Sequence, residues 1–295
     1  MSVVVTGASG YVGQHVCVGL AEREISVAAL GRAEQPGLFT CRRTGVTGSL
    51  ESFMDGADGI IHLAGRLVDN PAASVEDYFE ANVAFTDRVT HAAVEEGVPI
   101  IVHASSRLVY PSTLTAPARE TLDVAPDTAY GLSKAWAEDV VRVRTAGTGT
   151  SALSLRIGQV TGGDHPGIGV IRSLVRQAIQ RGTISVNGRG LAVRDIVHVQ
   201  DVADVLIRAT DYRGDWKAMN VGGVEPVTIT QIAHMVAKLA GISEDNITHV
   251  ETVTEDLSSY ALSPERAYAV LDWHASIPLT DIIAEVLATR EEETA

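Results

Sequence analysis

The 295-residue chain has few of the residues that cross-link small folds or bind metals. Cys17 and Cys41 are its only cysteines, too few for a disulfide framework or a zinc ribbon. Its nine histidines show neither an HExxH motif nor the paired spacing of metal ligands. We therefore expect no metal site, and a reducing cytoplasm is the simplest location for the protein.

Positive charge and long apolar runs are also scarce. The chain has 23 basic and 37 acidic residues, which gives a net charge of −14. This charge argues against nucleic acid or an anionic membrane as a partner. No apolar stretch approaches the roughly 18 residues of a membrane span, and Met1-Ser2 leads into an apolar strand without the basic region of a signal peptide. A small molecule is the expected ligand.

Short runs rich in Val and Ile alternate with amphipathic stretches, a pattern typical of repeated β-α units around a parallel sheet. The expected strands are 2–6, 25–30, 58–64, 99–104 and 151–157. The expected helices between them lie near 11–23, 75–97 and 128–146. Further along we expect a helix near 168–181, short strands within 183–198, a helix at 199–210, a strand at 217–221, and helices at 228–240, 264–271 and 279–289.

Three glycines follow the first predicted strand at a spacing typical of dinucleotide-binding loops. The strand ends at Thr6, and Gly7, Gly10 and Gly13 lead into a helix. Backbone N–H groups and the positive end of that helix would converge on a diphosphate. Strand before and helix after make this signal stronger than a bare glycine triplet, which elsewhere marks only tight turns.

These patterns predict an α/β fold with a Rossmann-like, doubly wound parallel sheet and a smaller mixed C-terminal substrate-binding region. The dinucleotide-binding domain is expected over 1–157 and the smaller region over 158–295. We expect the chain to cross back to the core near 194–222.

The second predicted strand lacks the acidic residue that usually binds the adenosine ribose about twenty residues past the last glycine. It ends instead in Gly31-Arg32. Arg32, with Arg42 or Arg43 as candidate helpers, is suited to a 2′-phosphate, so NADP is favoured over NAD as the cofactor. The alternative is that Arg32 is only solvated, because the choice between NADP and NAD rests here on a single position.

Tyr130 and Lys134 are separated by four residues within a predicted helix, so they share one face. An ammonium beside a phenol favours the phenolate, whose pKa is otherwise about 10. Upstream, the strand 99–104 leads into Ser105-Ser106 at the carboxyl edge of the sheet, the usual ligand position in such folds. Serine, tyrosine and lysine are therefore predicted to form one proton-transfer site.

At this point the sequence resembles the extended short-chain dehydrogenase/reductases, the NAD(P)-dependent epimerase/dehydratase family. The similar segments cover essentially the whole chain in the family's order. They are TGASGYVG at 6–13, IIHLAG at 60–65, HASSRLVYP at 103–111, YGLSK at 130–134, LRIGQVTGG at 155–163 and RDIVHVQDVA at 194–203.

The resemblance implies a catalytic role for Ser106, Tyr130 and Lys134. Tyr130 would be the acid/base, Lys134 would orient the nicotinamide ribose, and Ser106 would hydrogen-bond the reacting oxygen. Ser106, Gln159 and Arg194 would contact the substrate, while Asp195 is expected to be structural. The cofactor contacts expected from the glycine loop and the resemblance are Gly7, Ser9, Gly10, Tyr11, Val12, Gly13, Arg32, Leu63, Ala64, Gly65, Asn82, Tyr130 and Lys134.

Two departures from the family restrict the substrate. Dehydratases of nucleotide sugars carry an Asp-Glu pair directly after the hydroxyl residue, where this chain has Arg107 and Leu108. Dehydration is therefore disfavoured. The stretch 251–264 also lacks the second arginine with which epimerases hold a diphosphate. The candidates to replace it are Arg172, Arg176 and Arg189.

The leading hypothesis is an NAD(P)-dependent oxidoreductase or epimerase acting on a secondary alcohol or ketone of a sugar derivative, with nucleotide sugars included. An NADP-dependent carbonyl reductase or alcohol dehydrogenase for a small non-nucleotide metabolite is the runner-up, and a non-catalytic NADP-sensing protein is a third reading. His62 and His103 are expected to fill space rather than to catalyse. From the resemblance we expect a homodimer formed through the helices 75–97 and 128–146.

Overall fold

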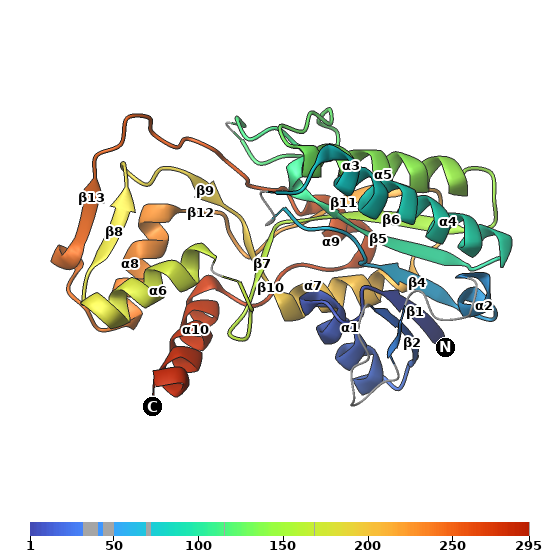
Figure 1. Cartoon of the computed structure of the whole chain (residues 1–295), viewed down its shortest axis with the longest axis horizontal. Helices are drawn as coiled ribbons and strands as arrows, with labels where there is room; N and C mark the ends of the chain where they lie inside the picture. The colour runs from blue at the N-terminus through green and yellow to red at the C-terminus, as the bar shows by residue number, and fades with distance from the viewer. Residues whose placement is uncertain (32–40, 44–49, 69–71, 115, 168, 295) are drawn as a thin grey trace.

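The structure is a computed structural model of the chain, which describes residues 1–31, 41–43, 50–68, 72–114, 116–167 and 169–294. Figure 1 shows a sheet-containing lobe with the N-terminus and a smaller lobe that ends in the C-terminal helix. No helix among these residues is long and apolar enough to cross a membrane.

The larger lobe is built on one seven-stranded sheet in which every neighbouring pair is parallel. The strand order is β11-β6-β5-β4-β1-β2-β3. The strands are β1 (Ser2–Thr6), β2 (Ser26–Gly31), β3 (Cys41–Arg43), β4 (Gly59–His62), β5 (Ile100–Ser106), β6 (Ser151–Ile157) and β11 (Lys217–Val221). The α/β fold with a doubly wound parallel sheet is thereby confirmed.

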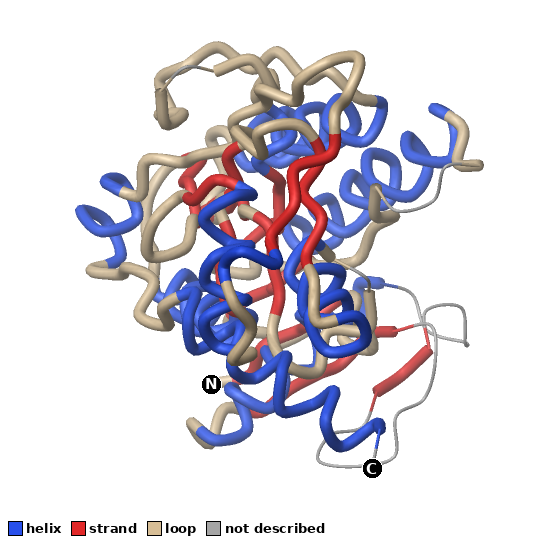
Figure 2. The backbone as a smooth tube through the Cα atoms, turned by 90° about the vertical axis from the view of Figure 1, so that its left-hand side faces the viewer, coloured by secondary structure: helices blue, strands red, loops and turns tan. Residues whose placement is uncertain are grey.

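Helices cover both faces of this sheet because its strands are apolar on both sides. Along β1, Val3 and Val5 pack in one core cluster with α1 (Tyr11–Glu22) and α7 (Val199–Arg208), whereas Val4 packs in another with α4 (Phe85–Glu95). Successive side chains of a strand point to opposite faces, so both layers are required. In Figure 2 the strands run through the interior with helices outside them.

The predicted helix 75–97 is one continuous helical segment of mixed geometry. It comprises α3 (Val75–Tyr78), a π-helical segment η1 (Phe79–Ala84) and α4. Ser74 caps the start, since its side chain accepts from the Asp77 N–H and Asp77 accepts from the Ser74 N–H. The sequence pattern did not indicate the π-helical segment, and it also missed β3, α2 (Leu50–Met54) and β13 (Ile247–Val250).

Helix α5 (Ala129–Thr145), which carries Tyr130 and Lys134, begins where its cap dictates. The hydroxyl of Thr128 accepts a hydrogen bond from the Gly131 N–H at 3.0 Å. The preceding strand β5 extends to Ser106, two residues beyond the predicted end, so Ser106 itself closes the strand. Ser106 therefore lies at the end of a strand, and Tyr130 lies in the first turn of a capped helix.

The smaller lobe has its own apolar cluster between α6 (Val170–Arg181), α8 (Ile229–Leu239) and α10 (Leu279–Thr294). Around it lie three two-stranded sheets. They pair β7 (Gln159–Thr161) with β10 (Ile196–His198), β9 (Val193–Arg194) with β12 (Val227–Thr228), and β8 (Ile184–Asn187) with β13. Between these elements the chain returns to the larger lobe through α7, β11 and later α9 (Glu265–Leu271).

Candidate active site

The glycine loop packs directly against the end of β4. Gly7 has a positive φ of 73°, and a Cβ atom added to it would lie 2.7 Å from the Ala64 nitrogen. A Cβ on Gly13 would lie 2.2 Å from the Gly7 carbonyl oxygen. Gly10 begins α1 without a side-chain cap. Within the part of the chain that the structure describes, no side chain caps the first N–H groups of α1, and a helix start of this kind suits an anion.

The histidine at the end of β4 is locked between two threonines. The Thr6 hydroxyl accepts from the Ala64 N–H and lies 2.6 Å from Nδ1 of His62, to which it donates because the single proton of the neutral ring is on Nε2. The Thr86 hydroxyl donates to the Asn82 carbonyl and therefore accepts from Nε2 of His62 at 2.9 Å. His62 is a neutral bridge between β1 and the helix that carries Asn82.

His103 lies beside His62 with ring centroids 5.7 Å apart. Burial, and next the positive charge of Lys134, lower the pKa of His62 to about 3, and the same causes hold the pKa of His103 well below its usual range. Nε2 of His103 is buried without a hydrogen-bond partner in the described part of the chain. Neutral, buried rings of this kind fill space, in line with the prediction for both histidines.

Asn82 joins the end of β4 to α5. Its Oδ1 accepts from the Arg66 N–H at 2.7 Å, and its Nδ2 donates to the Ser133 hydroxyl at 2.9 Å. A Cβ on Gly65 would lie 2.6 Å from that Oδ1 and 3.5 Å from Nζ of Lys134. Three residues predicted to contact the cofactor, Gly65, Asn82 and Lys134, are therefore immediate neighbours.

Lys134 is a buried cation. Only 6% of the residue is exposed, and its Nζ donates to the Ala104 carbonyl oxygen at 2.9 Å. Burial lowers its pKa to about 8, against the opposing effect of the Glu138 carboxylate. Tyr130, one turn earlier on α5, is also buried, and its ring lies 6.0 Å from that of Tyr78. The pair is part of the interior and not a solvated surface pair.

Ser106 reaches the same place from β5. Its hydroxyl accepts from the Leu108 N–H at 3.2 Å. The Leu108 carbonyl lies against the first turn of α5, since a Cβ on Gly131 would come within 2.1 Å of that oxygen. The close approach brings the segment after Ser106 onto the residue next to Tyr130. Hydroxyl, phenol and ammonium thus occupy adjoining segments at the carboxyl edge of the sheet.

Ser105 points to a different network. Its hydroxyl donates to Glu138 at 2.5 Å, and Glu138 forms a buried ion pair with Arg156 at 2.7 Å. Arg156 also donates to the Tyr110 hydroxyl at 2.7 Å. Ser105 is therefore committed to this network, and the catalytic role of Ser106 stays a prediction.

The predicted substrate residues lie on the strands that leave the sheet. The Gln159 N–H donates to the Asp195 carbonyl, which holds β7 beside the strand after Arg194. The carboxylate of Asp195 accepts from the backbone N–H groups of Gly223 and Leu262 at 2.6 and 2.8 Å. This arrangement agrees with the structural role expected for Asp195.

Arg194 lies over the ring of Tyr260, with its Cζ atom 5.0 Å from the ring centroid, and donates to Asp256 at 3.1 Å. Arg107 lies over the same ring at 3.4 Å. Sequence reasoning missed Tyr260 and treated Arg107 only as a departure from the family. No local signal in the sequence pairs these residues, because the contact forms only in the folded chain.

The loop after β7 fastens the smaller lobe to the start of α1. The Tyr11 hydroxyl donates to Asp164 at 2.9 Å, and His15 lies 3.2 Å from the other carboxylate oxygen. Burial, followed by the hydrogen bond to Asp164, raises the pKa of the Tyr11 phenol. Tyr11 is therefore a neutral donor beside the glycine loop.

Of the remaining predicted residues, Arg32 lies outside the described part of the chain. Arg172 donates to the Gly163 carbonyl, and Arg189 lies 3.7 Å from Glu255. These contacts do not place Arg172 or Arg189 next to Ser106. Within the described ranges no group of three metal-ligating side chains occurs.

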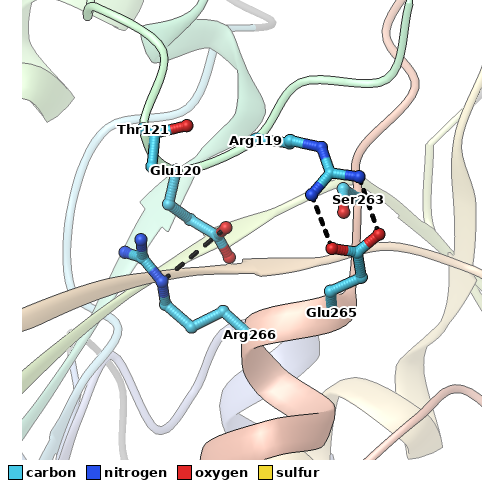
Figure 3. A pocket seen from close by; sticks show the side chains of 6 residues that line it. All are labelled: Arg119, Glu120, Thr121, Ser263, Glu265 and Arg266. Carbon is cyan, nitrogen blue, oxygen red and sulfur yellow. Dashed lines mark hydrogen bonds and ion pairs between the residues drawn. The ribbon is translucent and has the colours of Figure 1, made fainter.

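A polar hollow of about 300 Å³ lies between the segment near residue 120 and α9 (Figure 3). It is lined by Arg119, Glu120, Thr121, Ser263, Glu265 and Arg266. Arg119 and Glu265 form a two-point ion pair at 2.6 and 2.8 Å, and Glu120 lies 3.8 Å from Arg266 and accepts from the Asn220 N–H. These charges pair with one another, so the hollow is a structural junction.

The parallel sheet, the glycine loop and the buried tyrosine and lysine define an NAD(P)-dependent enzyme of the short-chain dehydrogenase/reductase class. The profile of the NAD dependent epimerase/dehydratase family matches residues 3–222, and the chain belongs to this family. The resemblance seen in the sequence is thereby confirmed.

Several known proteins are similar to this chain over most or all of its length. The chain is 28% identical to dTDP-4-dehydro-6-deoxy-D-allose reductase of Streptomyces bikiniensis, over 100% of this chain and 95% of that protein. It is 27% identical to UDP-glucose 4-epimerase of Azospirillum brasilense, over 81% and 77%. The solved structure of MoeE5 in complex with UDP-glucuronic acid and NAD superposes with a TM-score of 0.86 at 25% identity, covering 99% of this chain and 100% of that one.

Proposed function

We propose that the protein is an oxidoreductase or epimerase of nucleotide sugars, acting at a ring carbon that carries a secondary hydroxyl or a ketone. The observation that carries this proposal is the buried Tyr130 and Lys134 pair beside Ser106, at the sheet edge that also holds the glycine loop. A bound nicotinamide cofactor supplies the hydride transfer.

In this proposal Tyr130 exchanges the proton of the substrate hydroxyl through its phenol oxygen. The neighbouring ammonium of Lys134 stabilises the phenolate, and Ser106 orients the reacting oxygen by a hydrogen bond. The fixed position of Lys134 supports this, because its bond to the Ala104 carbonyl prevents the ammonium from turning to solvent. Buried charges interact more strongly than exposed ones, which supports this role for Lys134.

The residues present fit a dinucleotide. Gly7 and Gly13 leave no room for side chains where the loop folds, and α1 begins with unused N–H groups. Ser9, Gly10, Tyr11 and Val12 complete the loop and the first turn. Leu63, Ala64 and Gly65 follow β4 at the same edge, and Asn82 fixes their backbone by its bonds to Arg66. We assign Asn82 a positioning role in cofactor binding.

We retain NADP as the favoured cofactor, because no acid follows β2 and Arg32 stands in its place. The related solved structure named above, MoeE5, contains NAD. Arg32 is therefore the residue that decides this preference in our proposal.

The substrate class rests on the relatives. A dTDP-sugar reductase and a UDP-glucose epimerase are similar to this chain over most of its length. Gln159 and Arg194 are placed on strands that leave the sheet edge, and we assign them to the sugar and the diphosphate of the substrate. Residues 1–157 would bind the cofactor, and residues 158–295 would contribute most of the substrate site.

A homodimer through α3, η1 and α5 is also part of the proposal, as is a cytoplasmic location. Phe79 and Trp136 are 43% and 45% exposed and contact each other edge to face at 5.8 Å. Val75 and Val143 are exposed on the same segments. An apolar face of this kind is suited to self-association. Light scattering measures the oligomeric state, and we expect a dimer for the wild type and a monomer for Trp136→Glu.

The proposed function is tested with purified protein, NAD or NADP, and a panel of UDP- and dTDP-hexoses, following both the reduced nicotinamide and the sugar product. We expect turnover with one of these sugars and a loss of about 10²- to 10⁴-fold in Tyr130→Phe. Tyr78→Phe is the matched control and should retain turnover. The free hexoses are assayed beside the panel, and turnover of these alone would contradict the substrate class.

A further inference from the structure

Two arginines share one aromatic ring at the edge of the candidate site. The Cζ atoms of Arg107 and Arg194 lie 3.4 and 5.0 Å from the centroid of Tyr260. Their guanidinium groups are therefore no further apart than the sum of these distances. Arg107 directly follows Ser106 in the chain, so the backbone that carries the first cation continues from the strand that ends at the proposed catalytic serine.

The hydrogen bonds of the two arginines differ. Arg194 donates to the Val193 carbonyl, the Ser258 hydroxyl and the exposed carboxylate of Asp256. Nη1 of Arg107 is buried and has no hydrogen-bond partner among the residues described here. A buried guanidinium with an unused N–H group is costly unless an acceptor is supplied.

The surroundings of Arg107 favour an anion as that acceptor. Burial lowers the pKa of Arg107 to about 10, and the charge of Arg194 acts in the same direction. Tyr260, which also forms a side-chain hydrogen bond with Arg107, opposes them first, and Asp195 opposes them less. Asp195 is already committed to the N–H groups of Gly223 and Leu262. A bound anion would relieve the repulsion between the two arginines and complete the hydrogen bonds of Arg107.

Other arginines do not offer the same arrangement. Arg172 is directed to the Gly163 carbonyl, and Arg189 is largely exposed beside Glu255. Arg119 is held by Glu265 in the structural hollow of Figure 3. Within the described structure, only Arg107 and Arg194 lie over one ring and combine two cations with a buried, unpartnered N–H on the residue that follows Ser106.

We propose that Arg107 and Arg194 form a clamp for the diphosphate of a nucleotide substrate, with Tyr260 as the platform that spaces the two guanidinium groups. Two cations suit the two phosphates, and the planar guanidinium binds phosphate oxygens in pairs. Arg107 is then a substrate-binding residue that fills the place of the missing second arginine in the stretch 251–264. This inference rests on the proposed function and specifies how its substrate is held.

The test measures the affinity of UDP for the cofactor-loaded protein by calorimetric titration. We compare the wild type with Arg107→Met, which keeps the apolar body of the side chain over Tyr260 and removes the charge. Arg142→Met, an exposed arginine paired with Asp139, is the matched control. We expect Arg107→Met to bind UDP about 10- to 100-fold more weakly, with cofactor affinity unchanged, and the control to match the wild type.

A second variant keeps the test decisive if Arg107→Met does not fold. Arg107→Lys retains the charge without the planar fork, and we expect it to weaken UDP binding several-fold. UDP bound equally by the wild type and these variants would overturn the clamp while leaving the proposed function intact. A loss confined to UDP-glucuronic acid, with UDP and UDP-glucose unaffected, would assign Arg107 to a sugar carboxylate and would also overturn it.

Failure of the proposed function has a different signature. In that case the wild type would bind no nucleoside diphosphate and would turn over only substrates without one, which contradicts the clamp and the nucleotide-sugar substrate together.

Discussion

Lys134 donates a hydrogen bond from its Nζ to the carbonyl oxygen of Ala104 at 2.9 Å, and it does so while buried. The bond joins the helix that carries the candidate acid/base to the strand that ends at Ser106. The same burial lowers the pKa of Lys134 to about 8, which makes the residue a measurable cost to folding.

Replacing Lys134 with methionine should stabilise the protein at neutral pH while abolishing turnover. The pKa of this group is 10.5 in the unfolded chain and about 8 in the folded protein, so the unfolded state binds more protons between these values. Stability from this group therefore rises with pH across that window. After the lost bond to Ala104 is deducted, we expect a gain of about 1 to 2 kcal/mol at pH 7.

Urea denaturation at several pH values checks this result. The gain should shrink as the pH rises from 8 towards 10.5, because the wild-type lysine loses its proton first in the folded state, and it should be lost above 10.5, where the lysine is neutral in both states. Lys238→Met, on the exposed side of α8, should change stability little at any pH. A Lys134→Met protein less stable than the wild type at pH 7 would show that the buried ammonium is net stabilising.

Breaking the buried ion pair between Glu138 and Arg156 should destabilise the protein, in contrast to the replacement of Lys134. Glu138→Gln leaves the guanidinium of Arg156 without its compensating charge, and both side chains are about 5% exposed. We expect a loss of about 3 to 5 kcal/mol, together with a further fall in the pKa of Lys134, which Glu138 raises.

The matched control for Glu138 is its neighbour. Asp139 pairs with Arg142 at 2.6 Å on the exposed side of the same helix. Asp139→Asn should cost less than about 1 kcal/mol, because exposed ion pairs contribute little. Equal losses in the two variants would show that burial of the Glu138 pair does not matter.

The glycine loop gives a steric prediction. Gly13→Ala places a methyl group 2.2 Å from the Gly7 carbonyl oxygen, and backbone atoms there cannot move aside easily. We expect a loss of about 1 to 3 kcal/mol in stability and at least a tenfold loss in cofactor affinity. Gly149→Ala, where no atom lies within 4 Å of the new methyl group, should bind cofactor normally.

These predictions rely on features that differ in how far the sequence reveals them. The glycine loop and the Tyr130 and Lys134 pair were predicted because each lies within one turn or one helix, where spacing alone fixes the geometry. The alternation of strands and helices likewise predicted the order of the main elements. Fold class and candidate site were therefore accessible from the sequence.

The features that were missed depend on contacts between distant segments. Tyr260 brings Arg107 and Arg194 together, and no periodicity marks a ring that packs against residues far away in the chain. The sequence did not predict the π-helical segment that contains Asn82 either. The side chain of Asn82 forms hydrogen bonds to Arg66 and Ser133, which belong to other segments of the chain. Packing decides these details after the elements have formed.

The cofactor preference depends on one residue and can be measured directly. If Arg32 binds a 2′-phosphate, the wild type should prefer NADP, and Arg32→Ala should lose affinity for NADP by roughly tenfold while its affinity for NAD stays the same. Fluorescence titration of both cofactors checks this. If the wild type prefers NAD and Arg32→Ala changes neither affinity, the cofactor is NAD and the NADP proposal is wrong.

The central claim is that Tyr130 transfers a proton in a nicotinamide-dependent reaction of a nucleotide sugar. The most direct measurement mixes oxidised cofactor and protein with UDP- and dTDP-hexoses and records the absorbance of the reduced nicotinamide at once, for the wild type and Tyr130→Phe. We predict a rapid rise with at least one sugar in the wild type and its loss in Tyr130→Phe, with cofactor binding retained. An equal rise in both proteins would contradict the account.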